Sequence, residues 1–143
     1  MGIETQVTAF AGSKLLLFIG DQLAVILRDD FAHIPWPDHW DFPGGERDPG
    51  ETPEQCVIRE TREELAIALQ PRDLVWKRDF PREGSLPVWF FAAHLEASRE
   101  SDIRLGDEGQ CWQLMAAETY LNHPRAIPHF AERLRLYLGE CGR

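Results

Sequence analysis

The chain has 143 residues, 43% of them hydrophobic, a length and composition that suit a single folded domain over residues 1–143. No apolar run reaches the roughly 18 residues of a membrane span and nothing at the N-terminus resembles a signal peptide, so we expect a cytoplasmic protein that does not bind membranes. The formal net charge of −9 disfavours a long nucleic acid as partner, because phosphate backbones attract clustered Lys and Arg.

Two apolar runs near the start of the chain predict a β-hairpin. Leu15–Ile19 is continuously apolar, a Gly-Asp pair follows with turn chemistry, and Leu23–Leu27 supplies the second strand. The unbroken run of the first strand indicates that it is buried. A weaker pattern at Gln6–Phe10 predicts an earlier strand.

Arg28 closes the second predicted strand and has two interpretations. Its guanidinium is suited to bidentate contact with an oxyanion. The alternative is a solvent-exposed side chain that pairs with Asp29 or Asp30. The sequence leaves both open.

Phe31–His39 is predicted to be an irregular loop, because two prolines flank Trp36 and prevent regular structure. Trp36, Trp40 and Phe42 could stack on a nucleobase, since aromatic faces accept any base. For Trp40 and Phe42 we favour the alternative, in which the rings are buried over the open end of the sheet.

The stretch after Gly50 has the start signals of a helix. Thr52 can cap it, Pro53 suits the first helical position, and Gln55 stands where a capping box has Glu or Gln. One flank of this helix is mostly apolar and is predicted to pack on a sheet: Val57, Ile58, Thr61, Leu65 and Ala68.

Three acids on this predicted helix indicate a metal site. Glu60, Glu63 and Glu64 are expected to share one face, within a sector of roughly 100°. Like charges on adjacent turns repel unless a cation neutralises them, and oxygen ligands suit Mg²⁺, Mn²⁺ or Ca²⁺ better than zinc. Gly44 and Gly45 let the backbone approach a ligand, so a carbonyl there could join the metal shell.

The three cysteines are scattered without a CxxC pair and are expected to be reduced.

The spacing of these residues resembles the Nudix box. The positions that agree are Gly45, Glu51, Arg59, Glu60, Glu63, Glu64 and Ile67. Two positions depart, because the family usually has a large apolar residue where Thr61 stands and Gly where Ala66 stands. Ala66 matters if the helix ends there, since Ala resists the left-handed conformation that Gly tolerates.

The resemblance implies a fold and a set of roles. The fold would be an α/β/α sandwich with a mixed β-sheet. Arg28 would reach the substrate phosphates, as an Arg or Lys at about this place often does in the family. Glu51 and Arg59 would pair and orient the acids. The ligands of Mg²⁺, with Mn²⁺ as a substitute, would be the Gly45 carbonyl, Glu60, Glu63 and Glu64.

The rest of the chain predicts two strands and a covering helix. Asp73–Phe80 and Leu86–Leu95 read as strands joined by a turn at Pro81–Ser85. Val88–Ala92 lacks polar alternation, so the second strand should be covered on both faces. Ile127–Leu138 has apolar residues at helical spacing and predicts an amphipathic helix that ends before a glycine.

Glu108 begins a Glu-Gly-Gln sequence that is followed by Trp112, which resembles the mutator-type (MutT-like) Nudix pyrophosphatases. In those enzymes the matching Glu reaches back to the metals, whereas the alternative for Glu108 is an ordinary loop acid. Ala126 stands where they use an Asn to read oxidised guanine, so recognition of that base is not expected here.

The resemblance implies Mg²⁺-dependent hydrolysis of a diphosphate linkage in a nucleoside diphosphate derivative, with a nucleoside triphosphate cleaved to monophosphate and pyrophosphate as the leading reaction. The acid that accepts the proton could be Glu60, Glu64 or Glu108. The alternatives are an ADP-ribose, ADP-sugar or dinucleotide pyrophosphatase and a non-catalytic nucleotide-binding module. The partner expected in each case is a small nucleotide.

Overall fold

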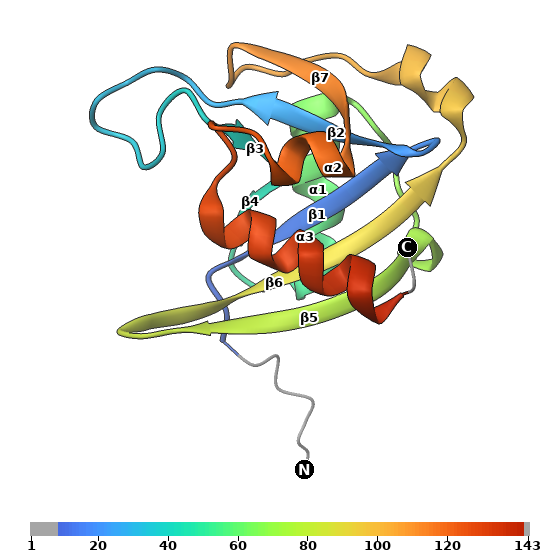
Figure 1. The fold of residues 1–143 in the computed structure, drawn as a ribbon. Helices are drawn as coiled ribbons and strands as arrows, with labels where there is room; N and C mark the ends of the chain where they lie inside the picture. The colour runs from blue at the N-terminus through green and yellow to red at the C-terminus, as the bar shows by residue number, and fades with distance from the viewer. Residues whose placement is uncertain (1–8, 142–143) are drawn as a thin grey trace.

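A computed structural model describes residues 9–141 and shows a mixed β-sheet between two helical layers (Figure 1). Helix α1 (Pro53–Leu65) lies behind the sheet in this view, and α3 (Pro128–Glu140) crosses its front. A short helix, α2 (Ala117–Leu121), precedes α3, and 3₁₀ turns cover Pro71–Asp73 and Ala97–Asp102. The α/β/α sandwich implied by the resemblance is confirmed. No helix in the described part of the chain is long and apolar enough to cross a membrane.

The sheet has seven strands, whose bounds are β1 Gly12–Ile19, β2 Gln22–Leu27, β3 Trp40–Asp41, β4 Gly44–Glu46, β5 Leu74–Arg82, β6 Ser85–Leu95 and β7 Cys111–Ala116. The strand order is β3-β2-β1-β6-β5, while β4 pairs with β1 and β7 pairs with β2. Strands β1 and β6 run parallel, and the other pairs are antiparallel. Strand β6 lies between β1 and β5, and its middle residues are buried on both faces, as the sequence predicted, because Phe90 belongs to the core with α3 residues and Phe91 to the core with α1 residues.

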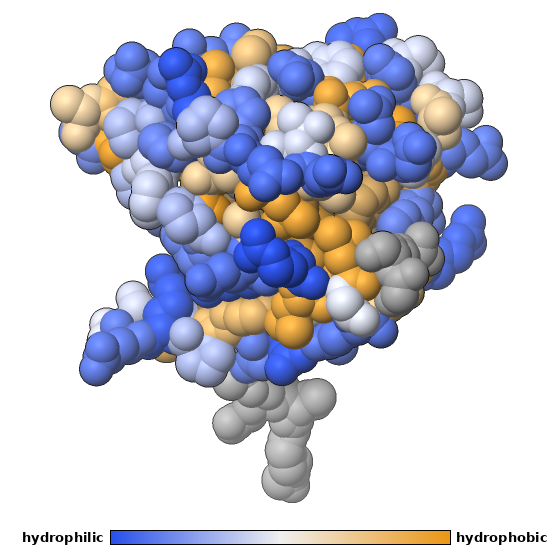
Figure 2. Space-filling view, viewed as in Figure 1, coloured by the Kyte–Doolittle hydropathy of each residue, from blue (hydrophilic) through white to orange (hydrophobic). Residues whose placement is uncertain are grey.

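Strand β1 contributes to two hydrophobic cores, because successive side chains of a strand point to opposite faces. Leu16 belongs to the core on the face covered by α3, together with Leu134, while Leu15 belongs to the core on the other face, together with Val57 of α1. On the α3 face, hydrophobic residues gather in the middle of the surface within a hydrophilic surround (Figure 2). The sheet therefore fixes α1, which carries the clustered acids, to one side of the molecule.

The predicted hairpin is confirmed, with Ile19 opposite Gln22 at its closed end. The two later strands are also confirmed as β5 and β6, although the strands extend further than predicted and leave a shorter turn. Helix α3 matches the predicted covering helix but runs through Gly139 instead of ending before it. The strand expected at Gln6–Phe10 falls mostly outside the described residues.

Helix α1 begins as predicted and ends where the chain departs from the family pattern. The Thr52 hydroxyl accepts a hydrogen bond from the Gln55 amide at 3.1 Å, and the Thr52 amide donates to the Gln55 side chain at 2.9 Å. At the other end Ala66 adopts a left-handed conformation with φ 61°. Ala68 was expected in the apolar stripe, which is wrong, because the helix has ended at Leu65 and Ala68 is exposed.

The aromatic residues around the predicted loop divide into buried and exposed rings. Trp40 and Phe42 are 8% and 0% exposed, which confirms the favoured core position. A stacking role for Phe42 is therefore wrong, because its ring packs between Tyr120 and Phe130 at centroid distances of 4.8 and 5.6 Å. Trp36 is 40% exposed on the loop.

Candidate active site

Two glycines bring the backbone of the loop before α1 against the acidic helix. Gly44 has φ 133°, and a Cβ there would lie 2.1 Å from the Ser13 carbonyl oxygen. A Cβ at Gly45 would lie 2.7 Å from the carboxylate of Glu60. Only glycine fits at position 44, because its φ is positive and the clash would be with backbone atoms, and the missing Cβ of Gly45 lets the Glu60 carboxylate lie against the Gly45 backbone. Cys56 lies underneath, with its Sγ 3.5 Å from the Gly45 carbonyl oxygen. This cysteine, Cys111 and Cys141 are free thiols, as expected.

A cleft of about 620 Å³ collects most of the predicted ligands, and we call it the main cleft. Gly45, Glu60, Glu64 and Glu108 all line it. Burial raises the pKa of Glu64 to about 7, against the opposing effects of the Lys14 charge and of a hydrogen bond from the Gly44 amide. Burial also raises the pKa of Glu60. Negative charge is thus held in a partly dehydrated space, an arrangement that a cation would stabilise.

Glu63 takes a different direction from the other two acids of the helix. Its side chain is 58% exposed, and its two carboxylate oxygens accept hydrogen bonds from Arg59 Nη1 at 3.1 and 3.2 Å. It does not line the main cleft. The three acids share one flank of α1 as expected, but only the Glu60 and Glu64 side chains line the main cleft.

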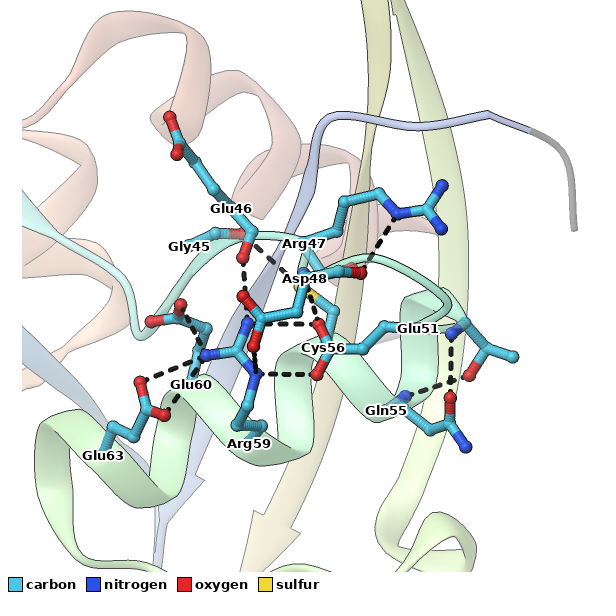
Figure 3. A network of polar contacts seen from close by, with 12 residues as sticks. Gly45, Glu46, Arg47, Asp48, Glu51, Gln55, Cys56, Arg59, Glu60 and Glu63 are labelled. Carbon is cyan, nitrogen blue, oxygen red and sulfur yellow. Dashed lines mark hydrogen bonds and ion pairs between the residues drawn. The ribbon is translucent and has the colours of Figure 1, made fainter.

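Arg59 connects the acids to the preceding loop (Figure 3). Its Nε donates to Glu51 Oε2 at 2.6 Å, its Nη2 donates to the Glu46 carbonyl at 2.9 Å, and its Nη1 donates to Glu60 at 3.1 Å. The Arg59 guanidinium lowers the pKa of Glu51. The predicted pairing of Glu51 with Arg59 is confirmed, and it fixes the loop relative to the helix.

Beside Arg28, the main cleft is lined by Lys14 and Asp41, two residues that sequence reasoning missed. Arg28 Nη1 donates to Asp41 at 2.9 Å, so the expected alternative of pairing with Asp29 or Asp30 is wrong. Lys14 Nζ also contacts Asp41, at 3.1 Å. The sequence signal that could have identified these residues was a charged residue within each of two otherwise apolar segments. A charge on a buried strand needs a partner.

Glu108 is held over the cleft by backbone contacts of its loop. The Gly106 amide donates to the Glu64 carbonyl and the Arg104 amide donates to the Leu65 carbonyl, each at 2.9 Å. These bonds satisfy carbonyls at the end of α1, which a helix terminus leaves without partners. The loop that carries Glu108 is thereby attached to the helix that carries the other acids.

The remaining substrate candidates lie outside the main cleft. Trp36 is not among its lining residues, although its neighbour Pro35 is. Ala126 is also absent from the lining, and its amide donates to the His123 carbonyl at 3.1 Å. A direct substrate contact for Ala126 is not supported by this geometry.

The donor set fits a hard divalent cation after a local rearrangement. Among residues 9–141, no group of three or more His, Cys, Asp or Glu side chains is already gathered closely enough to hold a metal ion. Glu60, Glu64 and Glu108 nevertheless share one cleft with the Gly45 backbone, and oxygen donors of this kind suit Mg²⁺ or Mn²⁺. Glu63 could join them only by leaving Arg59.

The fold and the site define an α/β/α protein with an acidic cleft built on a glycine turn and one helix. A profile of the NUDIX domain matches residues 15–135. The chain therefore belongs to the Nudix family.

Relatives and solved structures agree with this assignment. An 8-oxo-dGTP diphosphatase of Escherichia coli is 43% identical over 78 residues, which cover 53% of this chain and 57% of the relative. The match thus spans less than two thirds of that relative's length. An 8-oxo-dGTP diphosphatase of Haemophilus influenzae is 33% identical over 95 residues, covering 60% of this chain and 70% of the relative. The crystal structure of a MutT protein from Methanosarcina mazei superposes with a TM-score of 0.74 at 18% identity, over 97% of this chain and all of that chain (100%), and supports the fold.

Proposed function

We propose that this chain is a divalent-metal-dependent pyrophosphohydrolase that cleaves a diphosphate linkage in a nucleoside diphosphate derivative. The leading reaction is cleavage of a (deoxy)nucleoside triphosphate to the monophosphate and pyrophosphate. The observation that carries the proposal is a single cleft in which Glu60, Glu64 and Glu108 face Arg28 beside the Gly45 backbone. The names of the two diphosphatase relatives support the same substrate class.

Each part of the site has a role in this reaction. The proposed ligands are the Gly45 carbonyl, Glu60, Glu63, Glu64 and Glu108. Bound Mg²⁺ would supply a lowered pKa for water and charge compensation for the phosphate oxygens. Arg28 uses Nε on the Pro35 carbonyl and Nη1 on Asp41, which leaves its other terminal nitrogen for a phosphate oxygen.

The chemical step adds one water to a phosphorus atom and breaks one bridging P–O bond. The proton released by the attacking water passes to a carboxylate, for which Glu60, Glu64 and Glu108 are candidates because all three line the cleft. Glu51 and Arg59 act indirectly, by orienting Glu60 and the loop that contains Gly45.

A second candidate substrate class is a dinucleotide or ADP-sugar. It is favoured by a cavity that adjoins the main cleft on the far side of Glu64 and Glu108. A purely binding, non-catalytic module is disfavoured by the complete acidic motif. Oxidised guanine is not proposed as the base, since Ala126 has no side-chain group that could donate or accept a hydrogen bond.

The test is a screen of nucleoside triphosphates, ADP-ribose and dinucleotides with Mg²⁺, in which the products are separated. We expect a nucleoside monophosphate as one product and its formation to stop when a chelator is added. Binding of these nucleotides without turnover would support the non-catalytic alternative. Release of orthophosphate alone would contradict cleavage at the proposed linkage.

A further inference from the structure

The main cleft opens into a second cavity of about 320 Å³. Arg28, Asp41, Glu64 and Glu108 line both spaces. The shared residues are the proposed phosphate-binding cation, its carboxylate partner and two of the proposed metal ligands. A diphosphate held at this junction would therefore have space on each of its two sides.

The second cavity has aromatic side chains in its wall, whereas none of the described residues that line the main cleft is aromatic. Phe31 and His33 stack with ring centroids 5.6 Å apart and an interplanar angle of 7°. Phe31 is 52% exposed, so its ring forms a ledge that other protein atoms leave largely uncovered. Ile26 and Ile34 complete the wall. We call this cavity, lined by Ile26, Phe31, His33 and Ile34, the aromatic arm.

The loop that forms the aromatic arm is held in place by the loop that carries Glu108. The Gly109 amide donates to Asp29 Oδ2 at 3.1 Å. The Gln110 side chain donates to the Arg28 carbonyl and to Asp38 Oδ1, each at 2.8 Å. The arm is thus preformed, which lowers the ordering cost of binding a ligand there.

Charge decides which group the arm can accept. Its acidic lining residues are Asp29, Asp41, Glu64 and Glu108, and Arg28, already bonded to Asp41, is its one Arg or Lys. A terminal phosphate that extended past the junction into the arm would approach the Asp29 carboxylate, and among the described residues no Arg or Lys other than Arg28 lines the arm to compensate it. A planar, uncharged ring would instead stack on Phe31 and His33, since base–aromatic stacking tolerates any base.

We propose that the aromatic arm binds a second nucleobase, on the opposite side of the scissile linkage from the first nucleoside. The ligand class is a dinucleoside polyphosphate or related dinucleotide, with its phosphates at the junction and one ring on the Phe31–His33 ledge. This assignment rests on the proposed hydrolysis of a diphosphate linkage and deepens it, because it favours the second candidate substrate class, the dinucleotide, over a nucleoside triphosphate and names the residues that distinguish the two.

The experiment compares two substrates that differ only by the terminal nucleoside: diadenosine tetraphosphate and adenosine 5′-tetraphosphate. Wild-type protein is compared with the double variant Phe31→Ala/His33→Ala, with Phe31→Trp and with Val75→Ala. Val75 is a matched control, because it is 60% exposed on β5 and lines neither cavity. Circular dichroism and melting curves verify that each variant is folded.

We expect wild-type protein to prefer diadenosine tetraphosphate. The double variant should lower kcat/KM for that substrate roughly five- to a hundredfold, the range that follows from loss of one base–aromatic stack, and change the other substrate less than about twofold. Phe31→Trp should keep the preference and Val75→Ala should change neither substrate. An equal loss for both substrates would overturn the proposal, because it would place the only nucleoside of a mononucleotide in the arm. No loss for either would overturn it as well.

A binding measurement separates this inference from the proposed function. Calorimetric titration with the two tetraphosphates in the presence of Ca²⁺ measures the affinity for each ligand. The difference between the two affinities shows whether the aromatic arm binds the second nucleoside, whether or not turnover occurs. Tighter binding of diadenosine tetraphosphate that is lost in the double variant supports the arm even if no hydrolysis is found. Equal affinity of wild-type protein for both tetraphosphates rejects the arm and leaves the proposed hydrolysis intact.

Discussion

The Gly44 amide donates a hydrogen bond of 2.8 Å to Glu64 Oε1. This bond joins the glycine loop to the acid that burial affects most, since the pKa of Glu64 is raised to about 7. The amide keeps the carboxylate directed into the cleft, beside Gly45 and Glu60. The loop and the helix therefore depend on each other for the geometry of the proposed metal site.

Replacing Glu64 by Gln should lower kcat at least about a hundredfold, in the range seen for loss of one key electrostatic group. Gln can still accept the Gly44 hydrogen bond, so the fold should be retained while the charge is lost. We expect a similar loss for Glu63→Gln if Glu63 leaves Arg59 to bind metal. Steady-state kinetics with Mg²⁺ measure both, and turnover near the wild-type value in both variants would contradict the assignment.

Stability without metal should fall as pH rises from about 4.5 to about 7. The pKa of Glu64 is about 7 in the folded protein and its ordinary value is 4.5, so the folded state binds this proton more tightly than the unfolded state. Protonation of Glu64 therefore adds to the free energy of unfolding below the pKa of the unfolded state. This stabilisation is lost as pH rises through the pKa of the folded state. Urea denaturation with a chelator at several pH values measures how the free energy of unfolding changes with pH, and we call this change the pH slope.

Two comparisons make the pH prediction specific. Glu64→Gln should flatten the slope, because the titrating group is removed. Mg²⁺ should raise the melting temperature most at the higher pH values, since binding to the native state stabilises it by mass action and needs the carboxylate form. An identical slope in wild-type and Glu64→Gln protein would mean that another group causes it.

Local sequence signals were sufficient to predict the helix start, the hairpin and the aromatic core. Thr52, Pro53 and Gln55 act within one turn of chain, so their spacing determines the cap directly. The Nudix spacing likewise predicted which backbone and side-chain groups meet at Gly45 and Glu60. These features depend on neighbours close in sequence or on a fixed motif.

Features that depend on distant partners were not predictable. Asp41 pairs with Lys14 of β1 and with Arg28, which follows β2, and nothing near Asp41 in sequence indicates either partner. Glu63 has the helical spacing of a ligand, yet Arg59 one turn earlier binds its carboxylate. Periodicity assigns a residue to a helix face, whereas the side-chain rotamer follows from the nearest available charge.

Ala66→Gly should stabilise the protein by about 0.5–1 kcal/mol. Ala66 has φ 61°, a left-handed conformation that costs a residue with a Cβ roughly 1–2 kcal/mol, and the greater entropy of an unfolded Gly offsets part of the gain. Ala66 is exposed and lines neither cavity, so activity should not change. Chemical denaturation measures the effect, and a lower midpoint would show that the conformation carries no strain.

Glu108 is the proposed ligand with the least support from the motif, and it is the group that would separate a mutator-type site from a bare Nudix box. Its loop is attached to α1 through Gly106 and to the arm through Gly109. A Cβ at Gly106 would lie 2.2 Å from the Glu63 carbonyl oxygen, so this attachment tolerates only glycine. The loop backbone on both sides of Glu108 is thus fixed next to the cleft.

Glu108→Gln should therefore keep the fold, weaken the dependence on Mg²⁺ and lower kcat more than it raises KM, because a group that acts mainly on the transition state affects turnover. The loss should be smaller than for Glu64→Gln, since Glu64 lies on the helix beside Glu60 whereas Glu108 comes from a loop. An ordinary loop acid would instead leave both constants unchanged and shift stability by no more than about 0.5 kcal/mol. Kinetics of this variant across a Mg²⁺ titration distinguish the two cases, and wild-type parameters at every Mg²⁺ concentration would remove Glu108 from the metal site.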